Sequence, residues 1–377
     1  MYGMVPAPVQ QTRARSRKVK DYARSARRRP LTSEWQDTMQ RINVTLQDVA
    51  AAAGVSKTTA ASILRGDRGF QAARGTRERV QVTAARLGYR RNALAAALSS
   101  GRTHTVALLL PPLQSASDMA ALTRTFGQDV FVAVLNAASQ ANLRVLPTPL
   151  PTVADPPIAL KNLIDGRVDG LILVSLRDPD FVEQVYASMV PCVELSSGFG
   201  TRLVQPDNAG GAAAAVAHLA ERGHRRIVHW SGGVASSASE QRRSGFLAAA
   251  AKHGLRPEEV TITQDAASVA ALLGRPASER PTALFAFNDH QAFLTLDIAR
   301  GLGLRVPEDL SVVGFDNNIL AEAARPRLTT IYNPIQEQAD AAIKILQALW
   351  RGETDPVMPE KVSIRLIQRQ STTTAPF

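Results

Sequence analysis

The sequence predicts two folds in one chain: an all-α helix-turn-helix headpiece, followed by an α/β body of two doubly wound parallel-sheet subdomains. Three observations carry this prediction. Positive charge is concentrated in the first hundred residues, two short helical patterns meet at Gly54, and short apolar runs alternate with amphipathic segments beyond Gly101. At 377 residues and 45% hydrophobic content, the chain is long enough for two or three globular domains.

The formal net charge of +11 is spread unevenly along the chain. Residues 1–43 hold ten Lys and Arg against three acidic residues, and residues 44–100 hold nine against three. Residues 101–377 hold 25 basic and 27 acidic residues, so the whole excess lies before residue 101. A basic segment ahead of a nearly neutral bulk is typical of proteins that neutralise the phosphates of nucleic acids.

Residues 1–43 are rich in Arg, Pro and Gln and show no apolar periodicity, so we expect a basic disordered N-terminal extension. Three interpretations stay open for this segment. The first interpretation is an arm that contacts DNA, and the second is a solvated tail. The third is a stretch that precedes the true translation start at Met39.

Two short helices are predicted around the turn Ala53-Gly54-Val55-Ser56. Thr45 is a good cap for the first helix, whose apolar side chains recur at spacings of three and four until Gly54 ends it. Ser56 caps a second helix over residues 57–64. Small residues at such a turn allow two helices to cross closely, which is typical of a helix-turn-helix.

The second helix is the element that would read base edges, because the N-terminal residues of a recognition helix enter the major groove. We expect its exposed, DNA-facing positions to be Lys57, Thr58, Ala61, Ser62 and Arg65, with Lys57 and Thr58 as the first choices. A third helix, capped by Thr76, is predicted to close at Gly88-Tyr89.

Beyond Gly101 the alternation of apolar and amphipathic segments predicts repeated βαβ winding. Buried parallel strands are predicted at residues 106–110, 170–174, 226–230, 283–287 and 310–314. Helices are predicted between them at residues 130–141, 209–222, 240–253 and 290–301. Ligands of such sheets bind beyond the carboxyl ends of the strands, so we expect a binding site there.

The sequence favours neither an enzyme nor a membrane protein. The longest apolar stretches fall short of the roughly 20 residues of a membrane helix, and no secretory segment is present, so we expect a cytoplasmic protein. The six histidines never pair at a metal-ligand spacing, and no serine lies in a nucleophile-elbow pattern. The single cysteine, Cys192, is expected to be buried and inert. We therefore expect no metal and no cofactor.

Several motifs together resemble the lactose/galactose repressor (LacI/GalR) family. In the headpiece they are residues 44–50, 53–56, 76–80 and 87–89; in the body they are residues 168–172, 207–208, 222–227, 288–289, 306–316 and 328–331. The resemblance implies a periplasmic-binding-protein-like body in a ligand-responsive transcription regulator, typically a repressor. It also implies a homodimer on a pseudo-palindromic DNA operator, controlled by a small molecule that is most often a carbohydrate.

The resemblance also divides the chain. It implies a DNA-binding domain over 44–89, a hinge over 90–102 and an effector-binding and dimerisation domain over 103–377. Within that domain, an N-subdomain spans about 103–206 and 334–361, and a C-subdomain spans about 207–333 and 362–377.

In the family the hinge folds on operator DNA and inserts a leucine into the minor groove. Asn92 starts this hinge by position, and Leu98 is the inserted residue. An ordinary linker helix, with Leu98 in a domain interface, stays open as the second interpretation. Thr45 and Ser56, at the starts of the two helices, belong to the same expected DNA-binding surface.

Family ligand positions fall on Phe126, Arg242, Asn288 and Asp316. Asp316 accepts hydrogen bonds from hydroxyl or amino groups, Arg242 supplies a fork of donors, and Asn288 can do both. Each of the three polar residues can instead serve as a helix cap or make a domain-interface hydrogen bond. Phe126 would line the cleft.

A solute-binding protein or an enzyme built on the same two-lobed body would share the predicted body fold, and both functions stay open. The sequence does not decide between an inducer and a corepressor, nor between a dimer and a tetramer. Ala61 and Ser62 stand where the family commonly has Ser-Arg, so the operator sequence does not follow from relatives.

Overall fold

The computed structural model describes residues 44–67, 69–110, 126–149, 160–161, 163–176, 178–196, 198, 200–232, 237–255, 260–263, 265–354 and 362–376. The extension predicted over residues 1–43 lies outside these residues. The chain divides into two compact units, and the division falls between Ala96 and Ala97.

Three helices make up the described core of the first unit: α3 (Leu46–Ala53), α4 (Lys57–Arg65) and α5 (Arg74–Leu87). Their apolar faces meet in a small cluster built on Val49, Ala50, Ala53, Ala60, Ile63, Val80 and Ala84. Gly54 ends α3 in the left-handed conformation, with a φ of 64°, which a residue with a side chain adopts only under strain. The predicted helix-turn-helix is confirmed.

The predicted start of the third helix is wrong. α5 begins at Arg74, after Ala73, which makes no side-chain cap hydrogen bond. The backbone N–H groups of Thr76 and Arg77 donate to the carbonyl of Ala73 at 2.9 and 3.1 Å, so the first turn forms without a polar cap. Thr76 therefore lies inside the first turn of the helix.

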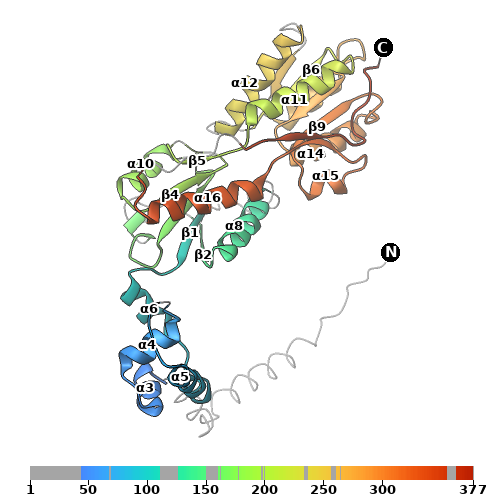
Figure 1. Cartoon of the computed structure of the whole chain (residues 1–377). Coiled ribbons are helices and arrows are strands. Elements are labelled where there is room, and N and C mark those ends of the chain that lie inside the picture. The colour runs from blue at the N-terminus through green and yellow to red at the C-terminus, as the bar shows by residue number, and fades with distance from the viewer. Residues whose placement is uncertain are drawn as a thin grey trace, which may run out of the picture. The chain divides into compact units, whose positions relative to one another are not determined.

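The second unit contains two lobes, each built on its own sheet (Figure 1). The first lobe has the strand order β2-β1-β3-β4-β5, and every neighbouring pair is parallel. Its strands are β1 (Thr105–Leu110), β2 (Arg144–Pro149), β3 (Gly170–Val174), β4 (Cys192–Leu195) and β5 (Leu203–Val204). Its helices are α8 (Gln128–Gln140), α10 (Pro179–Ala187) and α16 (Ile335–Trp350).

The second lobe has the strand order β11-β10-β9-β8-β6-β7. Only β11, at the edge, runs antiparallel to its neighbour among the described strands. The strands are β6 (Ile227–Trp230), β7 (Val260–Thr263), β8 (Ala283–Ala286), β9 (Ser311–Asp316), β10 (Thr329–Tyr332) and β11 (Arg365–Ile367). The helices are α11 (Asn208–Glu221), α12 (Ser237–Lys252), α13 (Ala266–Leu273), α14 (Asp289–Gly301) and α15 (Ile319–Ala323).

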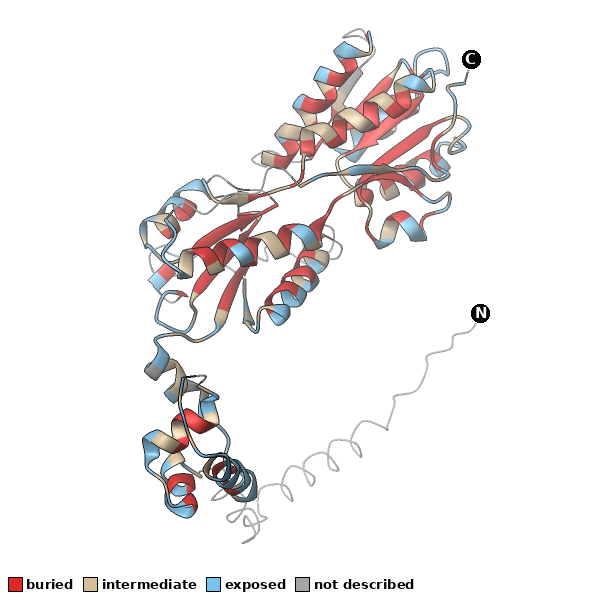
Figure 2. Ribbon diagram, in the orientation of Figure 1, coloured by how far each residue is buried: buried red, intermediate tan, exposed pale blue. Residues whose placement is uncertain are grey.

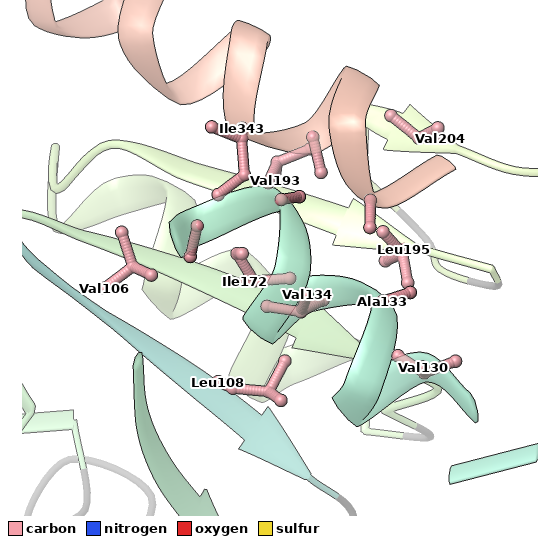
Figure 3. Close-up of a cluster of buried hydrophobic side chains, with 14 of the residues drawn as sticks. Val106, Leu108, Val130, Ala133, Val134, Ile172, Val193, Leu195, Val204 and Ile343 are labelled. Carbon is pink, nitrogen blue, oxygen red and sulfur yellow. The ribbon is translucent and has the colours of Figure 1, made fainter. Parts of the chain in front are cut away.

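Both sheets are buried where helices cover them, as Figure 2 shows. Every residue of β3, β4, β6, β8 and β9 is buried, so these strands are mostly apolar in sequence, although β4 includes Glu194 and β9 ends at Asp316. In the first lobe, α8 and α16 lie side by side over the sheet. Side chains such as Leu108 and Ile172 from the sheet meet Val134 and Ile343 from the two helices (Figure 3).

The chain passes between the lobes at three places in the sequence. It crosses from β5 to α11 near Pro206, from β10 to α16 at Asn333-Pro334, and from α16 back to β11 near Val362. Pro206 and Val362 form an isolated parallel bridge, so two of the crossings run alongside each other. α11 and α16 therefore each begin directly after a crossing.

The predicted α/β class is confirmed, and the five predicted strands form within two residues of the expected bounds. Cys192 is buried, as expected. Six described strands were not predicted, among them β2, β4 and β11, because short strands next to loops carry too few residues for a clear period. No described helix is long and apolar enough to cross a membrane.

Candidate functional site

The second helix of the helix-turn-helix, α4, is exposed along the face that its sequence predicts, with one exception. Lys57, Thr58 and Arg65 are exposed, and Ala61 is partly exposed. Ser62 is buried, with 7% of its surface accessible, so its predicted exposure is wrong. It lies beside Ile63 on the helix, and the packing of that apolar side chain into the headpiece core turns Ser62 inward as well.

Both expected caps form. The Thr45 hydroxyl oxygen accepts from the backbone N–H of Asp48 at 3.3 Å, and the Asp48 carboxylate accepts from the backbone N–H of Thr45 at 2.8 Å. The backbone N–H and the hydroxyl of Thr45 both donate to the Asp48 carboxylate, and these two hydrogen bonds lower the pKa of Asp48. Ser56 accepts from the backbone N–H of Thr59 at 3.0 Å. Thr45 and Ser56 therefore fix where α3 and α4 begin.

Arg79 was missed by sequence reasoning. Its Nε donates to the carbonyl of Ala53 at 2.9 Å and so joins α5 to the end of α3. Its spacing on α5 gave no signal, because the partner is a backbone atom 26 residues away.

The expected hinge forms a short helix, α6 (Ala93–Ser100). The Asn92 side-chain oxygen accepts from the backbone N–H of Ala95 at 3.1 Å, so Asn92 caps this helix. Leu98 is 89% exposed, and α6 has only eight residues. A helix of this length has little stability of its own in water.

In the second lobe, two predicted ligand residues come together at the carboxyl ends of the strands. Asp316 is the last residue of β9, and Arg242 reaches it from α12. The Nη2 atom of Arg242 lies 3.9 Å from Oδ1 of Asp316, and both side chains are about 95% buried. This is an ion pair without a hydrogen bond between the two groups.

Close packing of two helices brings Arg242 to this position. Gly245, three residues further along α12, lies against α11, where an added Cβ would stand 2.4 Å from the carbonyl oxygen of Ala209. Only a glycine at this position permits that approach. α12 can therefore lie low enough over the sheet for Arg242 to reach β9.

Two of the guanidinium nitrogens of Arg242 donate hydrogen bonds within the protein. Nε donates to the side-chain oxygen of Asn208 at 2.9 Å, and Nη1 donates to the carbonyl of Phe287 at 2.5 Å. The guanidinium carbon lies 3.5 Å from the ring centroid of Phe315 and 4.4 Å from that of Phe287. Burial lowers the pKa of Arg242 to about 10, and it stays charged at neutral pH.

Asp316 lies in a strained backbone conformation, with a φ of 115°. Burial raises the pKa of its carboxyl group to about 6, against the opposing effects of the Arg242 charge and a hydrogen bond from Asn333. The charge of Asp129, on α8 of the first lobe, raises this pKa further. A carboxyl group of this kind changes charge easily when its surroundings change.

Asn288 and Phe126 both have structural contacts of their own. The side-chain oxygen of Asn288 accepts from the backbone N–H of Gln291 at 2.9 Å, which makes Asn288 the cap of α14. Phe126 is partly buried and packs against the core of the first lobe. Among the described hydrogen bonds, the side chain of Asn288 is joined to Gln291 and not to Arg242.

Asp289 belongs to a motif shared with the family, but its pattern in the sequence indicated no role. It is fully buried, and its carboxylate accepts from the hydroxyl of Thr330 at 2.5 Å and from the backbone N–H of Asn318 at 2.9 Å. An added Cβ on Gly314 would stand 2.2 Å from this carboxylate, so the glycine leaves room for it. Burial and the charge of Asp316 raise the pKa of Asp289. Asp289 thus holds the turn that follows Asp316.

The buried histidines belong to the second lobe and not to a metal site. His218, His224 and His229 each hydrogen-bond to hydroxyl or carbonyl groups, and burial lowers the pKa of all three. Across the described ranges, no group of three or more His, Cys, Asp or Glu side chains could hold a metal ion.

Comparisons with known proteins agree with both parts of the molecule. Residues 45–92 match the bacterial regulatory proteins of the lacI family, and residues 216–372 match a periplasmic binding protein-like domain. The transcriptional regulator MalR of Streptomyces coelicolor is 31% identical over 352 residues, which cover 88% of this chain and 97% of MalR.

Two solved structures of regulators have a similar fold. The CelR–cellobiose complex is 28% identical and superposes with a TM-score of 0.63, covering 87% of this chain and 100% of CelR. A lac repressor dimer bound to operator and the anti-inducer ONPF, 24% identical, has the same fold, with a TM-score of 0.73 over 88% of this chain and 99% of that one.

A helix-turn-helix unit joined to a two-lobed binding domain defines a transcription regulator that binds DNA and responds to a small molecule. The chain belongs to the lacI family of bacterial regulatory proteins. The family resemblance of its motifs is thereby confirmed.

Proposed function

We propose that α4 reads base edges in the major groove through Lys57 and Thr58, with Ala61 and Arg65 on the same face. Ser62 is left out because it is buried. Thr45 and Ser56 lie where the exposed N-terminal ends of α3 and α4 present backbone N–H groups, a common geometry for phosphate contacts. The observation that supports this proposal is the exposure of Lys57 and Thr58 at the first turn of a capped recognition helix.

We further propose that residues 90–102 are a hinge that orders on DNA, with Asn92 at its start and Leu98 inserted into the minor groove. Leu98 has 89% of its surface exposed on an eight-residue helix, so its side chain is accessible for insertion between base pairs. The remaining domains are then a DNA-binding domain over 44–89 and an effector domain over 103–377.

The effector, in this proposal, binds to Arg242 and Asp316 at the carboxyl ends of the second-lobe strands, with Asn288 and Phe126 at its edges. The two charged groups lie 3.9 Å apart, and each keeps atoms that a ligand rich in hydroxyl groups could bond. The cellobiose bound by CelR supports a sugar or sugar derivative as the effector. A sugar presents many hydroxyl groups to such a pair.

The protein then acts as a homodimer, because one headpiece offers few base contacts and two linked headpieces gain effective concentration on a pseudo-palindromic operator. The lac repressor dimer on its operator supports this arrangement. We propose that it represses transcription in the bacterial cytoplasm, lies on the nucleoid when bound, and has no catalytic activity.

Two experiments test the proposal. Selection of binding sites from random duplexes by the full-length protein should return a two-fold symmetric sequence; enrichment without symmetry would contradict the dimer. The selected duplex is then titrated in the presence of cellobiose, maltose, ribose or guanine, and the melting temperature is followed in parallel, because only molecules that bind the folded state raise it.

A matched variant locates the effector site. Asp316→Asn keeps the shape of the side chain but removes its charge, so a melting shift that the wild type shows with one of these sugars should be lost. A shift that persists in Asp316→Asn would place the effector elsewhere. Formation of a product from any of the sugars would contradict the absence of catalysis.

A further inference from the structure

A buried chain of amide groups connects the candidate effector site to the first lobe. Asn333 lies at the crossing between β10 and α16 and is 4% exposed. Its side-chain nitrogen donates to Oδ1 of Asp316 at 3.1 Å. Its side-chain oxygen accepts from Nε2 of Gln338 at 2.7 Å. Asn333 therefore stands between the effector-site carboxylate and α16.

Gln338 belongs to the first lobe, because α16 packs on its sheet. Its side chain is fully buried, and Oε1 accepts from the hydroxyl of Ser196, at the end of β4, at 3.2 Å. Nε2 also makes a longer contact, 3.3 Å, with the carbonyl of Pro334. Both ends of the amide are therefore held by hydrogen bonds.

The surroundings of Gln338 are those of an apolar core. Ile335, Ala339 and Ala342, on the same helix, are buried in the main hydrophobic cluster of the first lobe. An apolar side chain of similar size would fill this position at no cost in desolvation. Packing alone does not explain a glutamine here, whereas the orientation of Asn333 does.

We propose that Gln338 is a positioning residue for the effector site, which directs the Asp316 carboxylate from the other lobe through Asn333. The inference rests on the proposed role of Asp316 in effector binding. If Gln338 loses its hydrogen bonds, the side-chain oxygen of Asn333 becomes a buried acceptor without its donor. Asn333 then rotates away, and Asp316 loses the donor that fixes its direction.

This arrangement links the site to the relative position of the lobes. The donor to Asp316 lies on the crossing segment itself, directly before the first turn of α16. A movement of α16 relative to β9 therefore changes the hydrogen bonding of Asp316. By linkage, a ligand that requires one direction of this carboxylate must favour one arrangement of the lobes.

The test measures the protonation of Asp316 and needs no effector. The charged groups that face Asp316 are Arg242 on α12, Asp289 on α14 and Asp129 on α8. The Asn333 hydrogen bond lowers the pKa of Asp316, which is about 6. Loss of that bond in Gln338→Leu raises the pKa, so the variant becomes progressively less stable than the wild type as pH rises through this value.

Denaturant unfolding of the full-length protein is followed at about pH 5 and about pH 8, in the wild type, Gln338→Leu, Asp316→Asn and the double variant. A half-unit rise in the pKa makes the effect of Gln338→Leu on the unfolding equilibrium constant roughly threefold larger at the higher pH. In the Asp316→Asn background, the effect of Gln338→Leu should be the same at both pH values. The titration of other groups cancels in this comparison.

Gln336→Leu is the matched control, because Gln336 lies on the same helix but donates to Ala133 and Asp340. Its effect should not depend on Asp316. Ser196→Ala removes only the distant end of the chain of hydrogen bonds, and it should shift the pH dependence in the same direction by a smaller amount. It also keeps the test decisive if Gln338→Leu does not fold.

A purely structural role for Gln338 would lower stability equally at both pH values in both backgrounds, and that result would overturn the inference. The outcome is separable from the proposed function. If the network controls Asp316 but no sugar binds, the effector assignment fails and the positioning role stands. If sugar binding depends on Asp316 but the pH dependence is unchanged, the positioning role fails.

Discussion

The headpiece and the proposed effector site use charged residues in opposite ways. Lys57 and Arg65 of the headpiece are exposed, and the basic excess of the chain lies before residue 101. In the effector site, Arg242 and Asp316 are about 95% buried and have protein partners on several sides. The first region is built to attract a large polyanion from water. The second keeps its two charges buried, where we propose that one small molecule binds.

This difference decides what each charge contributes to folding. Solvated charges on the headpiece can be exchanged with little effect on stability, because water stabilises them in the folded and the unfolded chain alike. A buried charge depends on its partners, and removal of one partner leaves the others without compensation. We therefore expect that a substitution of a buried charge lowers the unfolding free energy much more than a substitution of a headpiece charge does. The two kinds of substitution should differ less in how strongly they affect function.

The largest effect is expected for Arg242→Met, which keeps an unbranched apolar chain in place of the aliphatic part of arginine but leaves Asp316 and Asp289 buried without their cation. We expect a loss of ~3–5 kcal/mol of unfolding free energy. Denaturant unfolding monitored by the fluorescence of Trp230, a buried residue of the second lobe, measures it. Arg243→Met is the control, because Arg243 is partly exposed and pairs only with Glu240 in the described structure.

If Arg242→Met and Arg243→Met have the same unfolding curve, then burial of the Arg242 charge does not make it more important for stability, and the prediction is wrong. Lys57→Met sharpens it from the headpiece side. That variant should leave the unfolding of both units unchanged and weaken DNA binding, and a lower midpoint of headpiece unfolding, followed by far-UV circular dichroism, would show that Lys57 has a structural role.

A second prediction concerns Leu98, whose exposure contrasts with the buried apolar side chains of both units. Leu98→Ala should weaken binding to the selected operator by ~10-fold or more, because the inserted side chain allows the bend that brings further contacts. Alanine is a better helix former than leucine, so loss of α6 is not the cause. Gel-shift titration with operator and with a random duplex measures both affinities.

Leu98→Met keeps an apolar side chain of similar size and should retain most of the operator affinity. Equal losses on the operator and on the random duplex would mean that Leu98 does not contribute to specific binding. A role for Leu98 in a contact within the protein would then be favoured.

The two regions also differ in how much of them could be predicted from sequence. The caps at Thr45 and Ser56, the turn at Gly54 and the exposed face of α4 depend on residues within a few positions of one another, so local patterns predicted them. Ser62 was the exception, because the angular position of one residue near the edge of a helix face depends on how the partner helices pack.

The proposed effector site is assembled from residues that lie far apart in the sequence. Arg242 and Asp316 were found through the family resemblance, but their partners Asn208 and Asn333 were not. The sequence separations are 34 and 17 residues, and the hydrogen bonds exist only after two sheets and a crossing have formed. Gln338 is a polar residue on an otherwise apolar helix face. This pattern in the sequence could have predicted that it has buried polar partners.

A third prediction uses pH, since all six histidines lie in the second unit. Burial lowers the pKa of His229 from 6.5 to about 4. As the pH falls from 6.5 towards 4, His229 is protonated in the unfolded chain but stays neutral in the folded chain. The folded state therefore becomes less stable relative to the unfolded state over this pH range. We expect a loss of about 2 kcal/mol at about pH 5 from this residue.

His229→Gln isolates this contribution, because Asp316 and Asp289 titrate in the opposite sense and cancel between the two proteins. The stability advantage of the wild type over the variant should shrink as the pH is lowered from about 7.5 to about 5. If the stability difference between the wild type and His229→Gln does not change with pH, then His229 has the same pKa in the folded and the unfolded chain, and the prediction is wrong. Headpiece unfolding should be the same in both proteins.

The smallest effect is expected at Thr45, where a structural and a DNA-binding role coincide. Thr45→Ala removes the cap of α3 and should cost about 1 kcal/mol of headpiece stability. Thr45→Asp keeps an acceptor for the backbone N–H of Asp48, but it places a negative charge beside the Asp48 carboxylate, to which the Thr45 hydroxyl donates at 2.7 Å. If Thr45 lies against a phosphate, Thr45→Asp should weaken DNA binding by more than its change in headpiece stability accounts for, when it is compared with Thr45→Ala.

Thermal unfolding of the headpiece unit in the full-length protein and gel-shift titration together give both quantities. Thr45→Ser should match the wild type in each. If DNA affinity instead follows headpiece stability across the three variants, Thr45 acts only by ending the first turn of α3. The residue would then join Arg79 as part of the scaffold, and the binding surface would begin at Ser56.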